Sequence, residues 1–256
     1  MTASLDPGTI AANLAAVRAR LAHAAAASGR APDSIRLIAV SKTFGLESVR
    51  AAIAAGQQDF GENKVQEAVP KIETLAREMP AIADGIRWHL IGHLQSNKAR
   101  KAARPFDVIH SIDSIDLLKR IDAAAHETRR APELLVQVDL AGEVTKYGAA
   151  VDQVRPIFDA AAELTAATIV GLMVLPPWSE DAEVARPYFR RLRELRDELG
   201  SRGVPAARLR ELSMGMSHDF EVAIAEGATM VRVGTAIFGK RTPPPPTPPV
   251  GEPSES

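Results

Sequence analysis

The sequence predicts a (β/α)8 barrel, a closed sheet of eight parallel strands surrounded by helices. Short apolar runs rich in β-branched residues alternate with longer amphipathic stretches, which is the pattern of βα units. Eight of these runs read as strands, and residues 35–240 divide into eight units of about 26 residues each, the size expected of a compact barrel. A doubly wound open sheet shares the alternation and is the alternative, but the eight strand candidates favour the barrel.

The strand candidates are short and mostly aliphatic, and a helical stretch lies between each pair. The strands are expected at residues 35–40, 59–61, 87–91, 108–111, 134–140, 169–174, 209–213 and 230–234. The helices are expected at residues 46–55, 64–78, 96–103, 115–130, 151–166, 187–199 and 217–226. The sixth helix has the clearest spacing, with Tyr188, Leu192, Leu195 and Leu199 on one face. An additional helix at residues 10–28 precedes the first strand.

The end of the sequence differs from the rest. Residues 242–256 read TPPPPTPPVGEPSES, so seven of these 15 residues are proline. Proline has no N–H group and a fixed φ, and we therefore expect a disordered, extended tail. Residues 1–241 then form a single domain. Deleting the tail is expected to leave ligand binding unchanged.

Composition excludes several classes of protein. The 31 basic and 32 acidic residues give a net charge of −1, which provides no global attraction to nucleic acid or to an anionic membrane. The absence of cysteine excludes disulfides, thiolate metal sites and cysteine nucleophiles. The first 30 residues contain charged residues and no uninterrupted apolar segment, so we expect a cytoplasmic protein.

Functional groups of such a barrel are expected at the carboxyl ends of its strands. Lys42 directly follows the first strand, where burial can make a lysine amine a Schiff-base former, although most lysines at such positions are solvated. The segment from Ser213 to Ser217 closes the seventh strand and leads into a helix, which is typical of an anion site. Arg232 and Gly234 share one face of the eighth strand by its period of two. A phosphate site between these last two strands is therefore one interpretation; a helix cap with an ordinary glycine turn is the other.

Three histidines, His89, His93 and His110, raise the question of a metal site. No carboxylate or cysteine accompanies them at ligand spacing, so structural hydrogen bonds or a contact at the mouth of the barrel are favoured over metal binding.

The sequence resembles the pyridoxal phosphate homeostasis proteins, which are single-domain relatives of the barrel half of alanine racemases. The matching segments are IAVSK at 38–42, DFGENKVQE at 59–67, WHLIGHLQSNK at 88–98, GLM at 171–173, LSMGMS at 212–217 and VRVGTAIFG at 231–239. They occur in the family's order over about 200 residues.

The resemblance implies a fold-type III barrel that binds pyridoxal 5′-phosphate, with Lys42 as the Schiff-base lysine. It also implies the remaining cofactor contacts. Ser213, Ser217, Gly234 and Thr235 would bind the phosphate, Arg232 would face the ring nitrogen or the phosphate, and Asn63, Met173 and Met214 would line the ring.

The function that the resemblance implies is vitamin B6 homeostasis, in which the protein carries or buffers the cofactor, as a monomer, for pyridoxal phosphate-dependent apoenzymes. The racemases take a catalytic tyrosine from a second domain, and the proline-rich tail is not expected to replace it. Robust catalysis is therefore not expected. A racemase of small amino acids is the alternative, with Tyr147 or His218 as the base opposite Lys42. These two residues and Asp139 depart from the family pattern at the rim.

Overall fold

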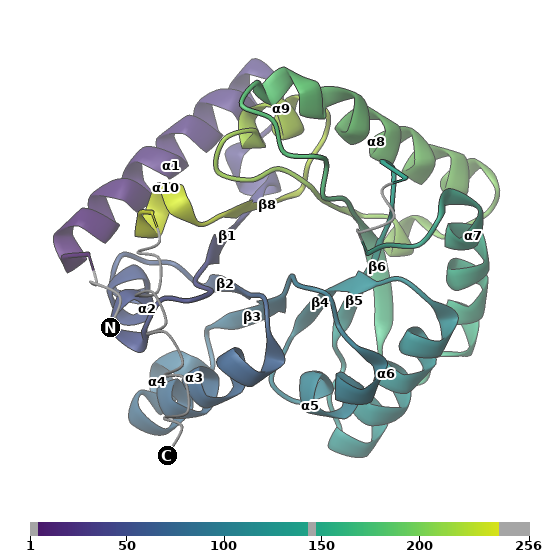
Figure 1. Ribbon diagram of the computed structural model, residues 1–256, viewed down its shortest axis with the longest axis horizontal. Helices are drawn as coiled ribbons and strands as arrows, with labels where there is room; N and C mark the ends of the chain where they lie inside the picture. Colours follow the sequence, from purple (N-terminus) through teal and green to yellow (C-terminus); the bar gives the residue numbers. More distant parts are fainter. Residues whose placement is uncertain (1–4, 143–146, 241–256) are drawn as a thin grey trace, which may run out of the picture.

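Eight parallel strands close into a barrel, which confirms the predicted fold class (Figure 1). The structure is a computed structural model that describes residues 5–142 and 147–240. The strands follow one another in chain order, and the last pairs with the first. They are β1 (Arg36–Val40), β2 (Asp59–Glu62), β3 (Arg87–Leu90), β4 (Val108–Ile112), β5 (Glu133–Gln137), β6 (Thr168–Met173), β7 (Glu211–Ser213) and β8 (Met230–Val233). The proline-rich tail at 242–256 lies outside the described residues.

Helices surround the barrel and connect its strands (Figure 1). They are α1 (Pro7–Ala27), α2 (Leu46–Ala54), α3 (Val65–Glu78), α4 (Pro80–Ala83), α5 (Ala99–Ala103), α6 (Ile115–Thr128), α7 (Val151–Ala160), α8 (Arg186–Ser201), α9 (Phe220–Ala225) and α10 (Thr235–Phe238). The four-residue helices α4 and α10 have no counterpart in the sequence-based prediction, because one turn is too short to show a helical period.

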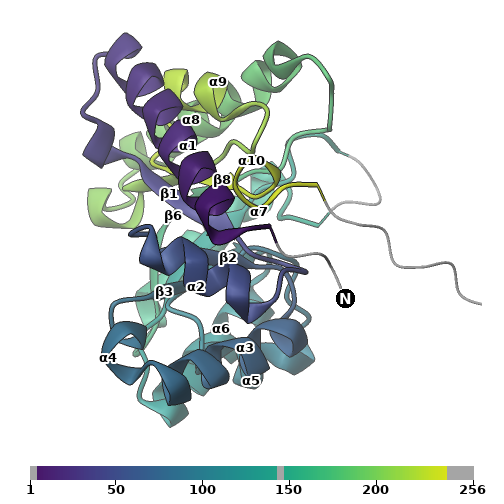
Figure 2. The same cartoon turned by 90° about the vertical axis from the view of Figure 1, so that its left-hand side faces the viewer.

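The helix before the first strand begins three residues earlier than predicted. The Asp6 carboxylate accepts a hydrogen bond from the Gly8 N–H and caps the helix, and Pro7 occupies the first helical position, where its missing N–H costs nothing. Helix α1 packs on α2, α9 and α10, and so covers the seam between β1 and β8 (Figures 1 and 2).

The fifth strand and the helix that follows it both end earlier than predicted, the helix at Ala160 instead of residue 166. Strand β5 ends at Gln137 instead of continuing to residue 140. Beyond it, Val138 forms an isolated bridge with Ala149, and the Asp139 carboxylate accepts hydrogen bonds from the N–H groups of Ala141 and Gly142. A carboxylate that turns back onto its own backbone ends an extended segment.

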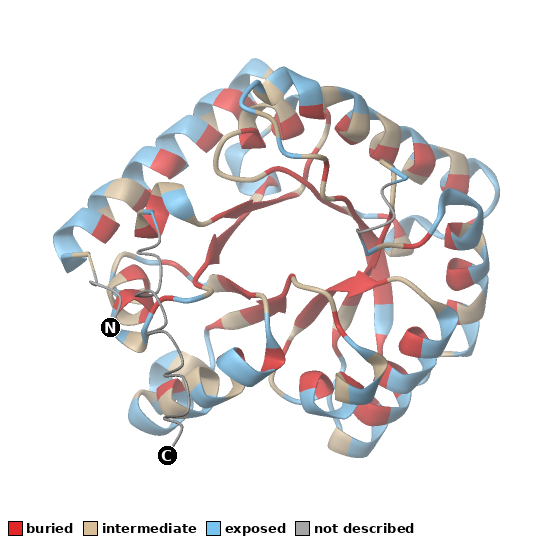
Figure 3. Ribbon diagram, in the orientation of Figure 1, coloured by how far each residue is buried: buried red, intermediate tan, exposed pale blue. Residues whose placement is uncertain are grey.

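The core has two layers, one inside the barrel and one between the barrel and its helices (Figure 3). The inner layer is small and aliphatic, and consists of Ile38, Val108, Leu135, Val170, Met173 and Met230. Because strand side chains alternate between the two faces, the neighbouring residues Leu37 and Ala39 belong to the outer layer. The inner layer fills the interior of the barrel beneath the carboxyl ends of the strands, and these ends remain free to form a site.

Among the described residues, the helices are too short or too polar for any of them to cross a lipid bilayer.

Candidate functional site

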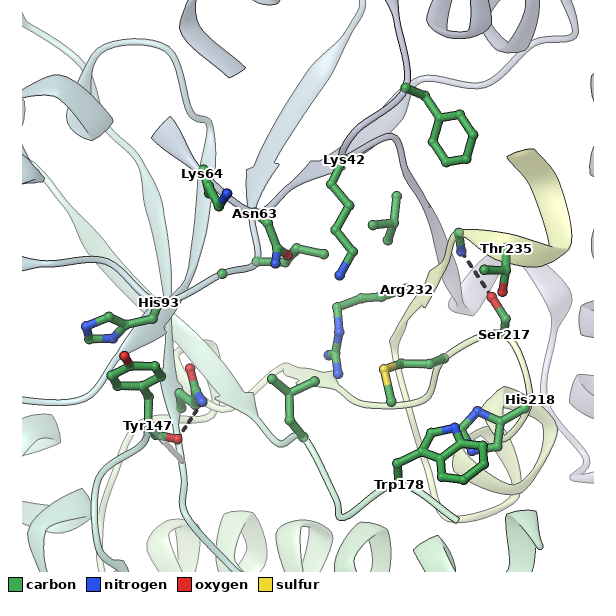
Figure 4. A pocket seen from close by; sticks show the side chains of 18 residues that line it. Lys42, Asn63, Lys64, His93, Tyr147, Trp178, Ser217, His218, Arg232 and Thr235 are labelled. Atoms are coloured by element: carbon green, nitrogen blue, oxygen red, sulfur yellow. Dashed lines mark hydrogen bonds between the residues drawn. The ribbon is translucent and has the colours of Figure 1, made fainter. Parts of the chain in front are cut away.

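A cavity of about 710 Å³ opens at the carboxyl ends of the strands (Figure 4). Its walls come from the last residues of the strands and from the loops that follow them. They are Val40, Lys42, Phe44, Asn63, Lys64, Ile91, Gly92, His93, Gln137, Tyr147, Leu175, Trp178, Met216, Ser217, His218, Arg232, Gly234 and Thr235. The volume lies within the range of small-molecule sites.

Lys42 extends into this cavity from the turn after β1 (Figure 4). The Phe44 N–H donates to the Ser41 carbonyl oxygen across the turn, 3.1 Å away. Between them Thr43 has a φ of 70°, a left-handed conformation that a β-branched residue rarely adopts. Backbone strain of this kind concentrates at functional sites, and here it lies beside the predicted lysine.

A buried ion pair lies directly behind the turn that carries Lys42. The Glu62 carboxylate, at the end of β2, is fully buried and accepts hydrogen bonds from Lys71 Nζ at 2.5 Å and Ser41 Oγ at 2.7 Å. Lys71 Nζ also donates to the Ser41 carbonyl oxygen. The pair holds Ser41 from both its side chain and its backbone, and thereby orients the next residue, Lys42.

Arg232 projects from β8 into the floor of the cavity and is 3% exposed. Its Nη1 donates to Ser213 Oγ at 2.5 Å, and its Nη2 donates to the Val174 carbonyl oxygen at 2.9 Å. Burial lowers the pKa of the guanidinium to about 10, against the opposing field of Asp219. The group therefore remains a cation at neutral pH and faces the cavity in a fixed orientation.

Ser217, Gly234 and Thr235 form a hydroxyl-rich corner of the cavity beside Arg232 (Figure 4). Ser217 Oγ accepts a hydrogen bond from the Gly234 N–H, 3.1 Å away, which joins the loop after β7 to the end of β8. A side chain at Gly234 would press against the Val40 carbonyl oxygen at 3.3 Å. These hydroxyl and backbone groups lie close together without filling the corner, as an anion site requires.

Two pairs of rings flank the mouth of the cavity (Figure 4). Tyr147 stacks on His93 with centroids 3.6 Å apart and ring planes 8° apart. On the other side Trp178, which is 72% exposed, lies 6.3 Å from His218. The sequence-based prediction placed Tyr147 and His218 at this rim but did not single out Trp178, because an exposed aromatic residue in a loop leaves no periodic signal.

Positive charge dominates the walls. Of the described residues that line the cavity, Lys42, Lys64 and Arg232 are cations, and none of the others is Asp or Glu. A cavity of this composition attracts an anion, and its lysine amine can react with a carbonyl group.

The structure brings six of the nine predicted cofactor contacts to the cavity and leaves three outside it. Lys42, Asn63, Ser217, Arg232, Gly234 and Thr235 line the cavity. Met173, Ser213 and Met214 are fully buried and do not line it. Met173 belongs to the inner core layer, Met214 packs in the outer layer, and Ser213 lies beneath Arg232.

Met216 is the methionine that lines the cavity after β7. Gly215, with a φ of 93°, lies just beyond the end of β7, where the chain turns away from the extended conformation. The methionine side chain that reaches the cavity is two residues later than the predicted Met214.

The amino-acid sequence is similar to those of known proteins over most of its length. Residues 9–242 match the family model of the alanine racemase N-terminal domain. The chain is 41% identical over 228 residues to a pyridoxal phosphate homeostasis protein of Aquifex aeolicus, and the match covers 89% of this chain and 96% of the relative. It is 40% identical over 232 residues to the pyridoxal phosphate homeostasis protein of Escherichia coli K12, and this match covers 91% of this chain and 97% of the relative.

Solved structures are similar as well. PipY of Synechococcus elongatus with PLP bound has a TM-score of 0.77 and 42% identity, and the match covers 90% of this chain and all of PipY. An alanine racemase of Clostridium difficile has a TM-score of 0.67 at 13% identity, which shows a shared barrel fold alone.

Proposed function

The chain belongs to the family of pyridoxal phosphate homeostasis proteins, and we therefore propose that it binds pyridoxal 5′-phosphate in the cavity at the carboxyl ends of its strands. In this proposal it acts in the cytoplasm as a monomer that carries or buffers the cofactor for pyridoxal phosphate-dependent apoenzymes. One observation carries the proposal: Lys42, Arg232 and the hydroxyl-rich corner defined above all line the same cavity.

The chemistry of the cavity walls fits the cofactor. Pyridoxal phosphate supplies a reactive aldehyde on an aromatic ring that bears a phosphate group. The Ser217 and Thr235 hydroxyls, with the Gly234 backbone, offer the phosphate a polar corner next to a buried guanidinium. A Cβ at Gly234 would narrow this corner. Asn63 and Met216 offer side chains to the ring.

Lys42 is the residue that we propose to hold the aldehyde. Its Nζ forms a Schiff base with the aldehyde carbon, and the aldehyde oxygen leaves as water. The step needs the neutral form of the Lys42 amine. A covalent but reversible bond suits a protein that stores a reactive aldehyde and later releases it.

Arg232 favours storage over catalysis. We propose that the guanidinium lies near the ring nitrogen and keeps that nitrogen unprotonated, since two adjacent positive charges repel each other. An unprotonated ring withdraws electrons weakly and activates a bound amino acid poorly.

The alternative function, a racemase of small amino acids, has one observation in its favour. Tyr147 and His218 both line the cavity that contains Lys42, so a second acid or base is present at the mouth. Tyr147 is 57% exposed and stacked on His93, however, which places its ring in the rim of the cavity and in contact with solvent.

The visible absorption spectrum of the purified protein with pyridoxal phosphate tests the proposal. We expect a yellow wild-type protein in which borohydride reduction labels Lys42, as identified by peptide mass analysis. Lys42→Ala should lose the label, whereas Lys64→Ala, which removes another lysine of the same cavity, should retain it. A wild-type protein that stays colourless with added pyridoxal phosphate contradicts the proposed function.

A further inference from the structure

A chain of polar side chains, all buried except the partly exposed Asp59, crosses the barrel beneath the cavity. His89 Nε2 lies 2.9 Å from Asp59 Oδ1, His89 Nδ1 lies 2.9 Å from His110 Nε2, and His110 Nδ1 lies 2.9 Å from Ser213 Oγ. Ser213 Oγ accepts the hydrogen bond from Arg232 described above. The chain therefore links five side chains from strands β2, β3, β4, β7 and β8.

We propose that Asp59, His89, His110 and Ser213 form a polarised relay that positions Arg232 and connects it to a carboxylate at the far end of the barrel. Asp59 is the first residue of β2, at the end opposite the cavity, and Arg232 lines the cavity floor. The four are positioning residues, and their role at the cofactor rests on the proposed function.

The two ends of the relay determine the direction of every hydrogen bond in it. A guanidinium can only donate, and an ionised carboxylate can only accept. His89 therefore donates from Nε2 to Asp59 and, as a neutral ring, accepts at Nδ1 from His110 Nε2. The neutral His110 ring in turn accepts at Nδ1 the proton of the Ser213 hydroxyl, whose oxygen accepts from Arg232. The opposite direction would turn a lone pair of His89 toward the carboxylate.

Burial keeps both imidazoles neutral, as this arrangement needs. His89 and His110 are fully buried. Burial is the main cause that lowers the pKa of His89, and the hydrogen bond and charge of Asp59 partly oppose it. Burial also lowers the pKa of His110, to well below its ordinary value, and the fields of His89 and Arg232 act in the same direction. Each ring can then accept at Nδ1 and donate at Nε2, as a relay member must.

The relay holds Arg232 through a neutral partner. The groups that accept its hydrogen bonds are the Ser213 hydroxyl and the Val174 carbonyl, and Asp219 is the carboxylate whose field acts on the guanidinium. A buried polar group that is left without its hydrogen bond is unfavourable. The aligned donors of the relay turn an oxygen lone pair of Ser213 toward Arg232 and end on the carboxylate of Asp59.

The position of the relay argues for a role beyond packing. Apolar side chains fill the rest of the inner layer, and apolar residues of similar size would fill the space of the two histidines without the cost of burying polar groups. The His110–Ser213 hydrogen bond spans from β4 to β7, and it ends on the residue that holds the cavity arginine.

The first test uses ring ¹⁵N NMR of the full-length protein without cofactor. We expect two of the six histidines, His89 and His110, to stay neutral with the proton on Nε2 as the pH falls below 6.5, where an ordinary histidine becomes protonated. Ser213→Ala removes one link, and the signals of both histidines should change, since the bonds polarise one another. A signal from His110 with its proton on Nδ1, or a change confined to His110, would overturn the relay.

The second test measures the effect on the site with pyridoxal phosphate as the probe. Ser213→Ala should weaken its binding about tenfold, or about 1.4 kcal/mol, the size of one hydrogen bond to a charged group. Asp59→Asn, at the far end of the barrel, should lower the pH at which the visible band of the bound cofactor changes, because the negative charge that polarises the relay is gone.

Glu211→Gln is the matched control for Asp59→Asn. Glu211 begins β7 at the same end of the barrel, its side chain is 13% exposed against 18% for Asp59, and both carboxylates lie near Arg36. The control removes the same charge without breaking the relay and should leave the pH midpoint as in the wild type.

Equal midpoints for Asp59→Asn and Glu211→Gln would refute the role of the relay at the site. A wild-type protein that binds no pyridoxal phosphate would instead refute the proposed function, and the NMR test would still decide whether the relay exists.

Discussion

Gly92 lies against the backbone of Asn63 so closely that a Cβ on Gly92 would stand 2.1 Å from the Asn63 carbonyl oxygen. Both residues line the cavity, Gly92 from the loop after β3 and Asn63 from the loop after β2. The glycine is needed here for the close approach of two backbones, because any side chain would push the β2 loop aside.

Gly92→Ala should therefore destabilise the protein and displace Asn63. We expect a loss of about 1–3 kcal/mol in the free energy of unfolding, as for other overpacked sites, measured by urea denaturation. Pyridoxal phosphate should also bind more weakly. Gly200→Ala is the control, since a Cβ there makes an ordinary 3.6 Å contact and alanine suits the helix. Equal stability of the two variants would contradict the explanation.

Stability should fall in mild acid because of the buried histidines. The folded-state pKa values of His89 and His110 lie below the ordinary value of 6.5. The unfolded chain therefore binds more protons as the pH falls below about 6.5, and unfolding is favoured down to the folded-state values. The charged groups that act on the two rings are Arg36, Asp59, Arg87 and Arg232.

The measurement is the free energy of unfolding by urea at several pH values between about 7.5 and 5. His110→Gln should weaken the dependence on pH, since one of the two titrating groups is removed. A wild-type free energy that stays constant over this range would show that the histidines are not buried as described.

Lys71→Met should be strongly destabilising, because it leaves the buried Glu62 carboxylate without its cation. Removal of one partner of a buried ion pair typically costs about 3–5 kcal/mol. The double variant Lys71→Met/Glu62→Gln should recover much of that loss in a double-mutant cycle. Additive losses would mean that the two side chains do not interact.

Ser217→Ala should weaken the binding of pyridoxal phosphate and leave the binding of pyridoxal nearly unchanged. The hydroxyl lies in the corner that we assign to the phosphate, and pyridoxal lacks that group. Equilibrium titration of both ligands, followed by absorbance, measures the difference. A similar loss for the two ligands would place the phosphate elsewhere in the cavity.

Exchange of the Cα proton of alanine or serine with deuterated solvent should be negligible for the protein loaded with pyridoxal phosphate. NMR of the amino acid over time measures it. Brisk exchange that Tyr147→Phe or His218→Ala abolishes would favour the racemase alternative over the carrier, since these are the two residues that the racemase alternative assigns as the base opposite Lys42.

The elements of the fold were predictable because each strand and long helix carries its own local signal. The eight strand candidates occur where the structure has strands, and the N-terminal helix was displaced by only three residues at its start. The end of β5 was not predictable, because Val138 and Leu140 alternate with Gln137 and Asp139 as in a strand. Only the contact with Ala149 and the Asp139 turn end the regular pairing.

The site was predictable in part. Family motifs and strand-end positions identified Lys42 and the corner beside Arg232, which the cavity brings together. The predicted contacts of Met173 and Met214 depend on which face of the barrel each side chain occupies, and neither lines the cavity. The sequence motifs contain both residues but do not carry that information.

The barrel, the order of its strands and the family were predictable from the amino-acid sequence, since these follow from periodicity and from motifs that are local in the chain. The polar residues that meet across the barrel were not predictable, because their contacts form only in the folded protein. His110 and Ser213 are 103 positions apart and yet share a hydrogen bond, because closing the sheet brings β4 and β7 to face each other across the interior. Contacts of this kind arise from closure, and no spacing along the chain encodes them.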